Sequence, residues 1–346
     1  MIKVLIVDDS ALIRKILTDI LSSDTEISVV GTARNGQEAL DKIEILKPDI
    51  VTLDIEMPLM DGLTTLRHIV SKYKLPVIMI SSLTSEGAEL TLKALDEGAV
   101  DFLPKPTNIF SLSQADIKRE IVEKIKAGAK SKFYIKETVK KTNTVKVDRL
   151  NITYAGFQNI IAIGTSTGGP RALQSLISEL PSDINASILI VQHMPPKFTK
   201  SLADRLNSIS NIKIKEAEDG DVLSRGCGYI APGDYHMTVV KESNDLVIRL
   251  NQDPQVMGLR PTVDKMMESV AKISGYSKIG VILTGMGSDG TNGIIKMRQS
   301  GSYTIAQDEA TSVVYGMPKS AIATNCIDII LPLDKIANKI INKVGV

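Results

Sequence analysis

The sequence predicts an α/β protein of two domains, each built on a parallel β-sheet, and three observations support this. The chain has 346 residues, whereas single domains commonly contain about 100–200. Short apolar runs alternate with helical patterns in both halves, which is typical of parallel sheets with right-handed crossovers. Residues 126–156 are rich in lysine and lack apolar periodicity. We therefore expect domains at 1–125 and 157–346, joined by a basic polar linker.

The overall composition is that of an ordinary globular protein, with 43% hydrophobic and 23% charged residues. The formal net charge of +1 gives no general attraction to nucleic acid or to an anionic membrane. The basic linker could contact nucleic acid, but no helix-turn-helix or aromatic platform accompanies it, so a solvated linker is favoured. Acidic residues interrupt the first apolar run, and no apolar stretch approaches the ~18 residues that span a bilayer. We expect a cytoplasmic protein without membrane insertion, whose Cys227 and Cys326 are buried thiols.

The first domain is expected to contain five strands separated by helices. Apolar runs predict the strands, and Ser10 is positioned to cap the helix that follows the first of them. In such parallel sheets, ligands bind at the carboxyl ends of the strands. The predicted strands are residues 2–7, 27–30, 50–53, 76–80 and 101–103.

Polar side chains follow four of these strands. Asp8 and Asp9 follow the first, Asp54 the third, Ser81 the fourth and Lys105 the fifth. Gathered carboxylates repel one another unless a divalent cation joins them, and oxygen ligands with open positions suit Mg²⁺. An aspartate beside that metal can accept a phosphoryl group, which Lys105 and Ser81 could then bind. Each acid could instead be a turn residue or a helix cap, but their convergence favours a site.

This set of residues resembles the response-regulator receiver domain over about residues 1–125. The resemblance implies a flavodoxin-like five-stranded fold in which Asp54 is the phosphoacceptor. It also implies that Asp9, within the acid pair that it forms with Asp8, binds Mg²⁺ and that the backbone carbonyl of Glu56 completes the protein ligands.

The same resemblance assigns switch positions. Ser81 and Phe102 match the hydroxyl and aromatic switch residues of receivers, and Lys105 matches their lysine. Phe102 stands where many receivers carry tyrosine.

The second domain, 157–346, also alternates strand and helix patterns. A predicted helix over 291–299 joins the last two of its strands. The predicted strands are residues 160–163, 187–191, 227–231, 279–283 and 302–307.

The first strand of this domain leads into a glycine-rich turn with a serine at its apex. Gly164, Ser166 and Gly168 have the spacing of a nucleophile elbow, in which glycines allow a sharp turn that exposes the hydroxyl. Pro170 fits the first turn of the following helix. Ser166 could alternatively be no more than a cap of this helix.

A serine nucleophile needs a base and an orienting acid. Of the three histidines, His68 lies on a helix of the first domain, whereas His193 and His236 both follow strands of the second. His193 is the preferred base because it ends a strand soon after the elbow. His236, beyond a Pro-Gly turn, is expected to shape the site or contact substrate. Asp289, in a glycine-rich turn after another strand, could orient the imidazole.

The turn that contains Asp289 also permits another interpretation. Residues 285–290 satisfy the GxGxxG pattern of dinucleotide-binding proteins, and Asp308 lies near the distance expected for a ribose-binding acid. A dehydrogenase is disfavoured because the charge of Asp289 would oppose a pyrophosphate at the helix N-terminus. It would also leave the elbow at Ser166 unexplained.

Four motifs of the second domain closely resemble those of the chemotaxis protein-glutamate methylesterases, the CheB family. With the receiver and the linker, this resemblance covers nearly the whole chain in the domain order of that family. The motifs are Gly164-Thr165-Ser166-Thr167-Gly168-Gly169-Pro170, Gln192-His193-Met194-Pro195, Ile230-Ala231-Pro232-Gly233-Asp234-Tyr235-His236 and Leu283-Thr284-Gly285-Met286-Gly287-Ser288-Asp289-Gly290.

The resemblance implies a doubly wound catalytic domain, with a mainly parallel sheet and a triad of Ser166, His193 and Asp289. It implies hydrolysis of glutamate methyl esters and deamidation of particular glutamines on methyl-accepting chemotaxis receptors, with a chemotaxis histidine kinase as phosphodonor. We expect a monomer without a catalytic-domain cofactor, in which the N–H groups of Thr167 and Met286 stabilise the oxyanion. A response regulator whose second domain only binds a partner remains the alternative.

Overall fold

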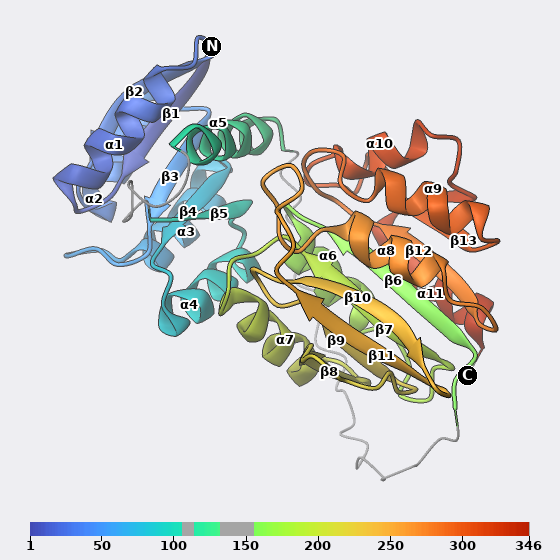
Figure 1. The fold of residues 1–346 in the computed structure, drawn as a ribbon. Coiled ribbons are helices and arrows are strands. Elements are labelled where there is room, and N and C mark those ends of the chain that lie inside the picture. The colour runs from blue at the N-terminus through green and yellow to red at the C-terminus, as the bar shows by residue number, and fades with distance from the viewer. Residues whose placement is uncertain (106–113, 132–155, 346) are drawn as a thin grey trace.

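A computed structural model describes residues 1–105, 114–131 and 156–345 of the chain, which form two α/β domains in contact with each other (Figure 1). The N-terminal sheet has the strand order β2-β1-β3-β4-β5, and every pairing is parallel. This confirms the predicted five-stranded fold. Its strands are β1 (Ile2–Val7), β2 (Ile27–Ala33), β3 (Ile50–Asp54), β4 (Val77–Ser81) and β5 (Asp101–Pro104).

Helices cover both faces of this sheet, and Ser10 caps the first of them as predicted. The last helix ends at Lys130. The expected boundary at residue 125 therefore lies too early, because Ile125 is buried in the domain core and Gly128 packs close to Ile50 and Ile78. Residues 132–155 of the expected linker lie outside the described residues. The helices are α1 (Ala11–Ser22), α2 (Gly36–Leu46), α3 (Gly62–His68) continuing as the π-helix η1 (Ile69–Tyr73), α4 (Ser85–Asp96) and α5 (Gln114–Lys130).

The C-terminal sheet has seven strands in the order β14-β13-β12-β6-β7-β9-β8, again with every pairing parallel. It contains the strands expected from the apolar runs, together with two at the edges that sequence patterns did not indicate. Edge strands bury fewer side chains and so leave a weaker apolar signal. The strands are β6 (Asn159–Thr165), β7 (Ala186–Gln192), β8 (Lys213–Glu216), β9 (Cys227–Ile230), β12 (Ser277–Ile282), β13 (Tyr303–Gln307) and β14 (Ile329–Leu331).

Alternate residues of the central strand β6 face different helical layers. Ile161 and Ile163 belong to one apolar cluster with α6, α7 and α11, whereas Ile160 and Ala162 belong to another with α8, α9 and α10. Burial on both faces explains why the strand is a continuous apolar run. The helices are α6 (Gly169–Ile177), α7 (Phe198–Ile209), α8 (Val263–Ala271), α9 (Thr291–Gln299), α10 (Met317–Ile322) and α11 (Leu333–Val344).

An antiparallel hairpin, β10 (His236–Glu242) and β11 (Asp245–Asn251), lies beside the second helical layer and contacts α8. The sequence analysis did not predict this hairpin, in which His236 is the first residue of a strand. No helix in the described parts of the chain is long and apolar enough to cross a membrane.

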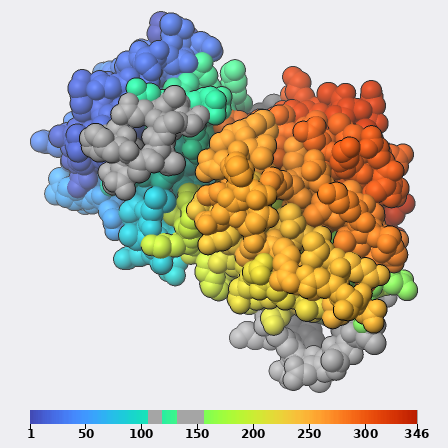
Figure 2. All heavy atoms as spheres, viewed as in Figure 1, coloured from blue at the N-terminus to red at the C-terminus, as the bar shows by residue number. Residues whose placement is uncertain are grey.

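The two domains share one apolar cluster rather than merely touching at their surfaces. This cluster includes Leu53 and Phe102 of the N-terminal domain together with Phe198 and Leu202 of α7. The rings of Phe102 and Phe198 stack with centroids 4.7 Å apart and planes 2° apart. The space-filling view shows the corresponding contact between the cyan region of α4 and the yellow-green region of α7 (Figure 2).

Candidate functional site

The predicted triad comes together at the carboxyl edge of the C-terminal sheet. Strand β6 lies between β12 and β7. Ser166 directly follows β6, His193 directly follows β7, and Asp289 lies in the turn between β12 and α9. Because the chain leaves β6 in one direction and later returns on its other side, this edge is the topological switch point, where ligands bind in such sheets.

Ser166 occupies the sharp turn that its glycine spacing predicts. Gly168 adopts φ +77°, which favours glycine, and Pro170 lies in the first turn of α6. The N-cap of α6 is Gly168, with no side-chain cap, so Ser166 does not serve as the helix cap. Gly285 of the neighbouring turn is equally constrained, since a Cβ there would lie 2.9 Å from Cβ of Ser166.

His193 and Asp289 are hydrogen-bonded to each other, as the predicted triad requires. Nε2 of His193 lies 2.8 Å from Oδ2 of Asp289, and their side chains are 9% and 1% exposed. The Asp289 carboxylate also accepts hydrogen bonds from the N–H groups of Val263 at 2.6 Å, Asp264 at 3.0 Å and Gly290 at 2.9 Å. Asp289 thus caps the N-terminus of α8, whose own N-cap residue, Thr262, makes no side-chain capping bond.

The ionisation of Asp289 follows from these donors. Burial disfavours the charged carboxylate, but the hydrogen bond and charge of His193 and the N–H groups of Val263 and Asp264 outweigh it and hold the pKa of Asp289 below its ordinary value. A carboxylate bonded to Nε2 of His193 favours the tautomer with its hydrogen on that nitrogen, and Nδ1 is then without a proton.

The nucleophile turn is held by its backbone. Ser166 N donates to the carbonyl of Thr284 at 3.1 Å, and Nε2 of Gln192 donates to the carbonyl of Ser166 at 3.0 Å. The Ser166 hydroxyl makes no hydrogen bond to His193 within the described structure. The N–H groups of Thr167 and Met286 donate no hydrogen bond to any described residue, which leaves them available for an oxyanion.

Two further interpretations lose support, namely contact of His236 with substrate and dinucleotide binding by the GxGxxG turn. His236 is fully buried, with its ring nitrogens 3.3 Å from Oγ1 of Thr262 and from the carbonyl of Pro254. Asp308 accepts hydrogen bonds from the N–H and hydroxyl of Thr311, which fixes a local turn. The helix that follows the GxGxxG turn, α9, is not open for a pyrophosphate, because Gly293 N in its first turn donates to the carboxylate of Asp264.

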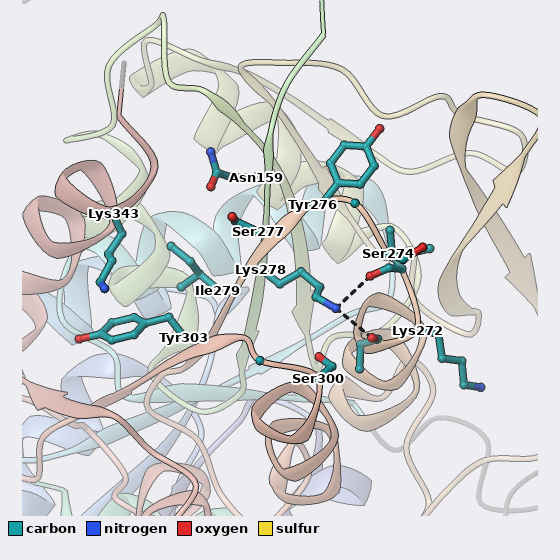
Figure 3. A pocket seen from close by; sticks show the side chains of 14 residues that line it. Asn159, Lys272, Ser274, Tyr276, Ser277, Lys278, Ile279, Ser300, Tyr303 and Lys343 are labelled. Carbon is teal, nitrogen blue, oxygen red and sulfur yellow. Dashed lines mark hydrogen bonds between the residues drawn. The ribbon is translucent and has the colours of Figure 1, made fainter.

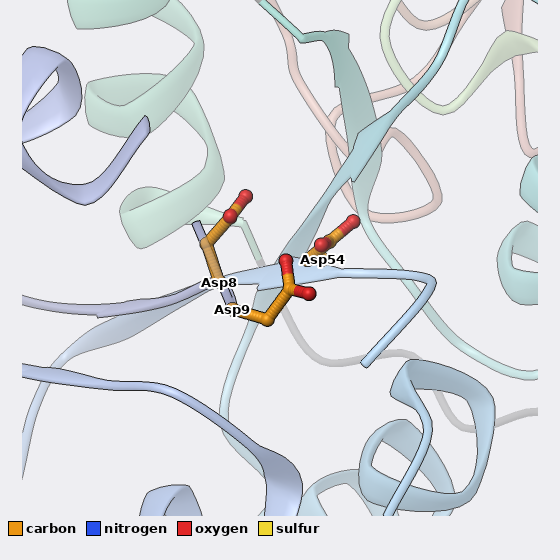
Figure 4. A group of neighbouring side chains, drawn as sticks. All are labelled: Asp8, Asp9 and Asp54. Atoms are coloured by element: carbon orange, nitrogen blue, oxygen red, sulfur yellow. The ribbon is translucent and has the colours of Figure 1, made fainter. Parts of the chain in front are cut away.

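A second polar site lies at the carboxyl edge of the N-terminal sheet, where Asp8, Asp9 and Asp54 converge (Figure 4). One carboxylate oxygen from each lies within 4.8 Å of the others. Lys105 Nζ donates to Oδ2 of Asp54 at 2.7 Å and lies 3.9 Å from Oδ2 of Asp8. The structure therefore brings together the acids and the lysine that the sequence placed at three strand ends.

The donor set of this acid cluster fits Mg²⁺. Oδ2 of Asp8 is buried without a hydrogen-bond partner. Burial, reinforced by the charge of Asp54, raises the pKa of Asp8 to about 6. Burial also raises the pKa of Asp54, although the hydrogen bond from Lys105 opposes this. Hard oxygen ligands whose charges lack compensation are the environment that a divalent cation stabilises.

The comparisons with known proteins match both domains. The CheB methylesterase family model matches residues 161–340, and the response regulator receiver domain model matches residues 4–116. A protein-glutamate methylesterase/protein-glutamine glutaminase of Pyrococcus horikoshii is 47% identical, covering 100% of this chain and 94% of the relative. One of the same description from Bacillus subtilis is 47% identical, covering 98% of both chains.

This chain belongs to the CheB methylesterase family. The crystal structure of the Thermotoga maritima CheB methylesterase catalytic domain superposes with a TM-score of 0.53 at 45% identity, covering 55% of this chain and 100% of that domain. We accordingly call the N-terminal domain the receiver and the C-terminal domain the catalytic domain.

The two residues predicted as receiver switches, Ser81 and Phe102, bond to or stack on groups outside the acid cluster. The hydroxyl of Ser81 donates to the carbonyl of Gly87 at 3.1 Å and accepts from Thr91 Oγ1 at 2.8 Å, so it is engaged with α4. Phe102 is turned into the interface, where it stacks on Phe198. Both side chains are buried.

A cavity of about 650 Å³ lies at the opposite edge of the catalytic sheet from the triad (Figure 3). Its lining includes Tyr276 and Tyr303, together with Lys278, whose Nζ donates to the carbonyls of Ala271 and Ile273. Lys278 thereby satisfies the last carbonyls of α8. None of the predicted site residues lines this cavity, so we do not assign the chemistry to it.

Several residues that shape the site were missed from sequence. Thr284 hydrogen-bonds to Thr167 O through its hydroxyl, and Asp264 accepts from Gly293 N behind the triad. Asp101 of the receiver accepts a hydrogen bond from Thr167. Only the motif around Thr284 gave any signal, since Asp264 and Asp101 lie in stretches with no glycine-rich or histidine-containing pattern.

Proposed function

We propose that this protein is a serine hydrolase that demethylates glutamate methyl esters of methyl-accepting chemotaxis receptors and deamidates particular glutamines in them. The observation that carries the proposal is the convergence of Ser166, His193 and Asp289 at one sheet edge, with His193 bonded to Asp289 at 2.8 Å. The names of the relatives, protein-glutamate methylesterase/protein-glutamine glutaminase, support the choice of reaction.

In this mechanism the hydroxyl of Ser166 attacks the ester carbonyl, and Nδ1 of His193 takes its proton. Asp289 stabilises the imidazolium that forms, because its carboxylate is already ionised. The N–H groups of Thr167 and Met286 donate to the oxyanion, and each such donor typically contributes about 3–4 kcal/mol to transition-state stabilisation.

The tetrahedral intermediate then collapses. His193 returns the proton to the leaving oxygen, methanol departs, and an acyl-enzyme remains on Ser166. Water attacks the acyl-enzyme with His193 again as base, and the free glutamate carboxylate is released. A glutamine amide follows the same course with ammonia as the leaving group.

The receiver is proposed to be phosphorylated at Asp54 by a chemotaxis histidine kinase. Asp8, Asp9 and Asp54, with the carbonyl of Glu56, would hold Mg²⁺, which when bound neutralises charge on the transferring phosphoryl group. Lys105, now paired with Asp54, would pair instead with a phosphoryl oxygen. Ser81 must leave its bonds to Gly87 and Thr91 to reach that group.

The unphosphorylated receiver is proposed to obstruct access to the triad. It contacts the catalytic domain through α4 and β5 at α6, at α7 and at the turn that contains Ser166. Movement of Phe102 on phosphorylation would disturb its stack with Phe198. Reversing a closed-to-open ratio of 99:1 would need about 5.5 kcal/mol of differential stabilisation, so a partial shift is expected.

The deciding experiment measures release of methanol from methylated receptor membranes by wild type and Ser166→Ala. We expect the variant to be inactive and the control Ser178→Ala, which changes an exposed serine beyond α6, to be normal. Absence of methanol release by wild type as well as by Ser166→Ala would favour the alternative in which the second domain only binds a partner, and equal activity of the two proteins would refute Ser166 as the nucleophile.

A separate measurement tests the receiver. After treatment with a small phosphodonor, mass spectrometry should find phosphate on Asp54 alone, and EDTA should prevent its incorporation. Phosphate on another residue, or incorporation that EDTA does not reduce, would refute this part of the proposal.

A further inference from the structure

The contacts between the receiver and the catalytic domain differ in burial and in the part of the catalytic domain that they involve. Asp96 of α4 accepts hydrogen bonds from Gln174 of α6 at 2.6 Å and from Arg205 of α7 at 2.8 Å, both at exposed positions. Asp101 of β5 accepts from Oγ1 of Thr167 at 2.7 Å, in a buried position. Thr167 directly follows the nucleophile, so this last bond ties the receiver to the turn that contains Ser166.

The bond from Thr167 to Asp101 lies in a charged but dry environment. Thr167 is 2% exposed and Asp101 is 6% exposed. The other oxygen of Asp101 accepts from Phe102 N at 2.8 Å, and Lys124 Nζ lies 3.5 Å from Oδ2. Burial opposes the charge on Lys124, but the carboxylates of Asp101 and Glu120 outweigh it and raise its pKa. Thr167 therefore donates to the same carboxylate oxygen that faces the Lys124 ammonium, and hydrogen bonds that involve charged groups are stronger than those between neutral groups.

Two hydrogen bonds hold Thr167, one to the catalytic domain and one to the receiver. Its carbonyl accepts from Thr284 Oγ1 of the catalytic domain at 3.0 Å, while its hydroxyl is held by the receiver. In the same structure the Ser166 hydroxyl makes no hydrogen bond to His193, although His193 is in place on Asp289. The receiver thus contacts the turn that contains Ser166, and the hydroxyl of Ser166 is the part of the site that is not hydrogen-bonded to His193.

We propose that Asp101 is a positioning residue through which the unphosphorylated receiver restrains Thr167, and with it the turn that presents Ser166 and one oxyanion donor. The receiver then slows the attack of Ser166 itself, in addition to obstructing the receptor. Asp101 adjoins Phe102, so displacement of β5 on phosphorylation would break the bond. The inference rests on the proposed role of Ser166 as nucleophile.

A small reagent separates this restraint from obstruction of a large substrate. An alkyl fluorophosphonate reacts by forming a bond from Oγ of Ser166 to phosphorus, while fluoride leaves and the hydroxyl proton passes to His193. Its labelling rate on the unphosphorylated full-length protein, read by mass spectrometry, reports readiness of the turn. We expect Thr167→Val and Asp101→Ala to be labelled about tenfold faster than wild type, the effect of losing one buried hydrogen bond to a charged acceptor.

Further variants make the test specific. Thr167→Ser keeps the hydroxyl that donates to Asp101 and should lose most of the acceleration seen in Thr167→Val, whereas the control Ser178→Ala, at an exposed serine beyond α6, should be labelled at the wild-type rate. Asp96→Ala breaks only the exposed interdomain bonds, so it should speed receptor demethylation without speeding labelling. If Asp101→Ala fails to fold, Thr167→Val still tests the same hydrogen bond, because it retains Asp101 beside Lys124.

The outcomes distinguish the inference from the proposed function. Labelling of Ser166 at the wild-type rate in both Thr167→Val and Asp101→Ala overturns the inference alone. If Asp96→Ala accelerates labelling as much as Thr167→Val and Asp101→Ala do, the inference is also overturned, because any weakening of the interface would then be enough to speed labelling. Absence of labelling at Ser166 in every variant, with or without phosphodonor, overturns the proposed hydrolase and the inference together.

Discussion

Asp289 of the catalytic domain and Asp8 of the receiver are both buried carboxylates at the carboxyl edge of a parallel sheet, yet their pKa values move in opposite directions. Asp289 accepts from three backbone N–H groups and from His193, and its pKa is lowered. Asp8 has an oxygen without a hydrogen-bond partner and lies beside Asp54, and its pKa is raised to about 6. Burial penalises both charges, so the donors and the neighbouring charge decide the sign.

The difference matches what each site has to do. A triad acid must be ionised before the substrate arrives, and the protein itself supplies the compensation for its charge. In a phosphoacceptor cluster a cation would compensate the negative charge of the carboxylates. The protein accordingly supplies them with few hydrogen-bond donors. The same residue type at the same kind of sheet edge therefore gives a carboxylate whose charge the protein compensates in one domain and a cluster whose charge a cation would compensate in the other.

The largest effect should come from removing the negative charge of Asp289, which the catalytic domain compensates with hydrogen bonds. Asp289→Asn should lower kcat of receptor demethylation by roughly 10³–10⁴, because a neutral amide no longer fixes the tautomer of His193 or stabilises its charged form. Asp289→Ala should retain more activity than Ser166→Ala or His193→Ala. If Asp289→Asn kept most of its activity, the comparison would be wrong on its catalytic side. His236→Gln is the control and should lose less than about threefold, being outside the triad.

The receiver side is tested by Asp8→Asn without metal. Because the folded pKa of Asp8, about 6, exceeds the ordinary 3.8, the folded state holds its proton more tightly. Stability is thus lost as pH rises from about 4 to about 6, up to about 3 kcal/mol. At pH 7.5 in EDTA, Asp8→Asn should raise the free energy of unfolding of the receiver, measured by denaturant titration with hydrogen exchange.

Mg²⁺ provides the control for this stability measurement. Millimolar Mg²⁺ should stabilise wild type more than Asp8→Asn and so reduce or reverse the difference between them. A variant that is less stable than wild type in EDTA would show that Asp8 is compensated within the protein after all.

Separating the two regions physically should have a smaller effect. A fragment starting near residue 157 should demethylate receptors about tenfold faster than the unphosphorylated full-length protein, consistent with a partly closed population. It should not respond to a phosphodonor. The crystal structure of the Thermotoga maritima catalytic domain at 45% identity indicates that such a fragment can fold. A fragment no faster than the full chain would mean that the receiver activates instead of obstructing.

The smallest effect concerns His236, a buried titratable group without a carboxylate against its ring. Burial lowers the pKa of His236 below its ordinary 6.5. Its contribution to stability is therefore present above pH 6.5 and lost as pH falls below that value, since the unfolded chain takes up the proton first. His236→Gln should flatten the dependence of stability on pH below 6.5. Unchanged pH dependence would show that the ring is not buried in its neutral form.

Sequence patterns alone determined much of this protein. Alternating apolar runs predicted two parallel sheets, because strands that are buried on both faces must be continuously apolar, as Ile160 to Ile163 are. The glycine spacing around Ser166 predicted its turn, because few residues other than glycine adopt the φ of Gly168. The acids and Lys105 after separate strands predicted the receiver cluster, because carboxyl ends of parallel strands share one edge.

The tertiary structure decided what depends on partners distant in the chain. Local pattern could not show that Asp289 caps α8, since its donors Val263 and Asp264 come from a helix more than twenty residues earlier. It could not show the β10–β11 hairpin, where pairing rather than strong apolar alternation defines the strands. The bond from Thr167 to Asp101 depends on how two independently patterned domains dock. The sign of a pKa shift and the coupling between domains depend on which groups meet in space, and the order of residues along the chain does not specify that meeting.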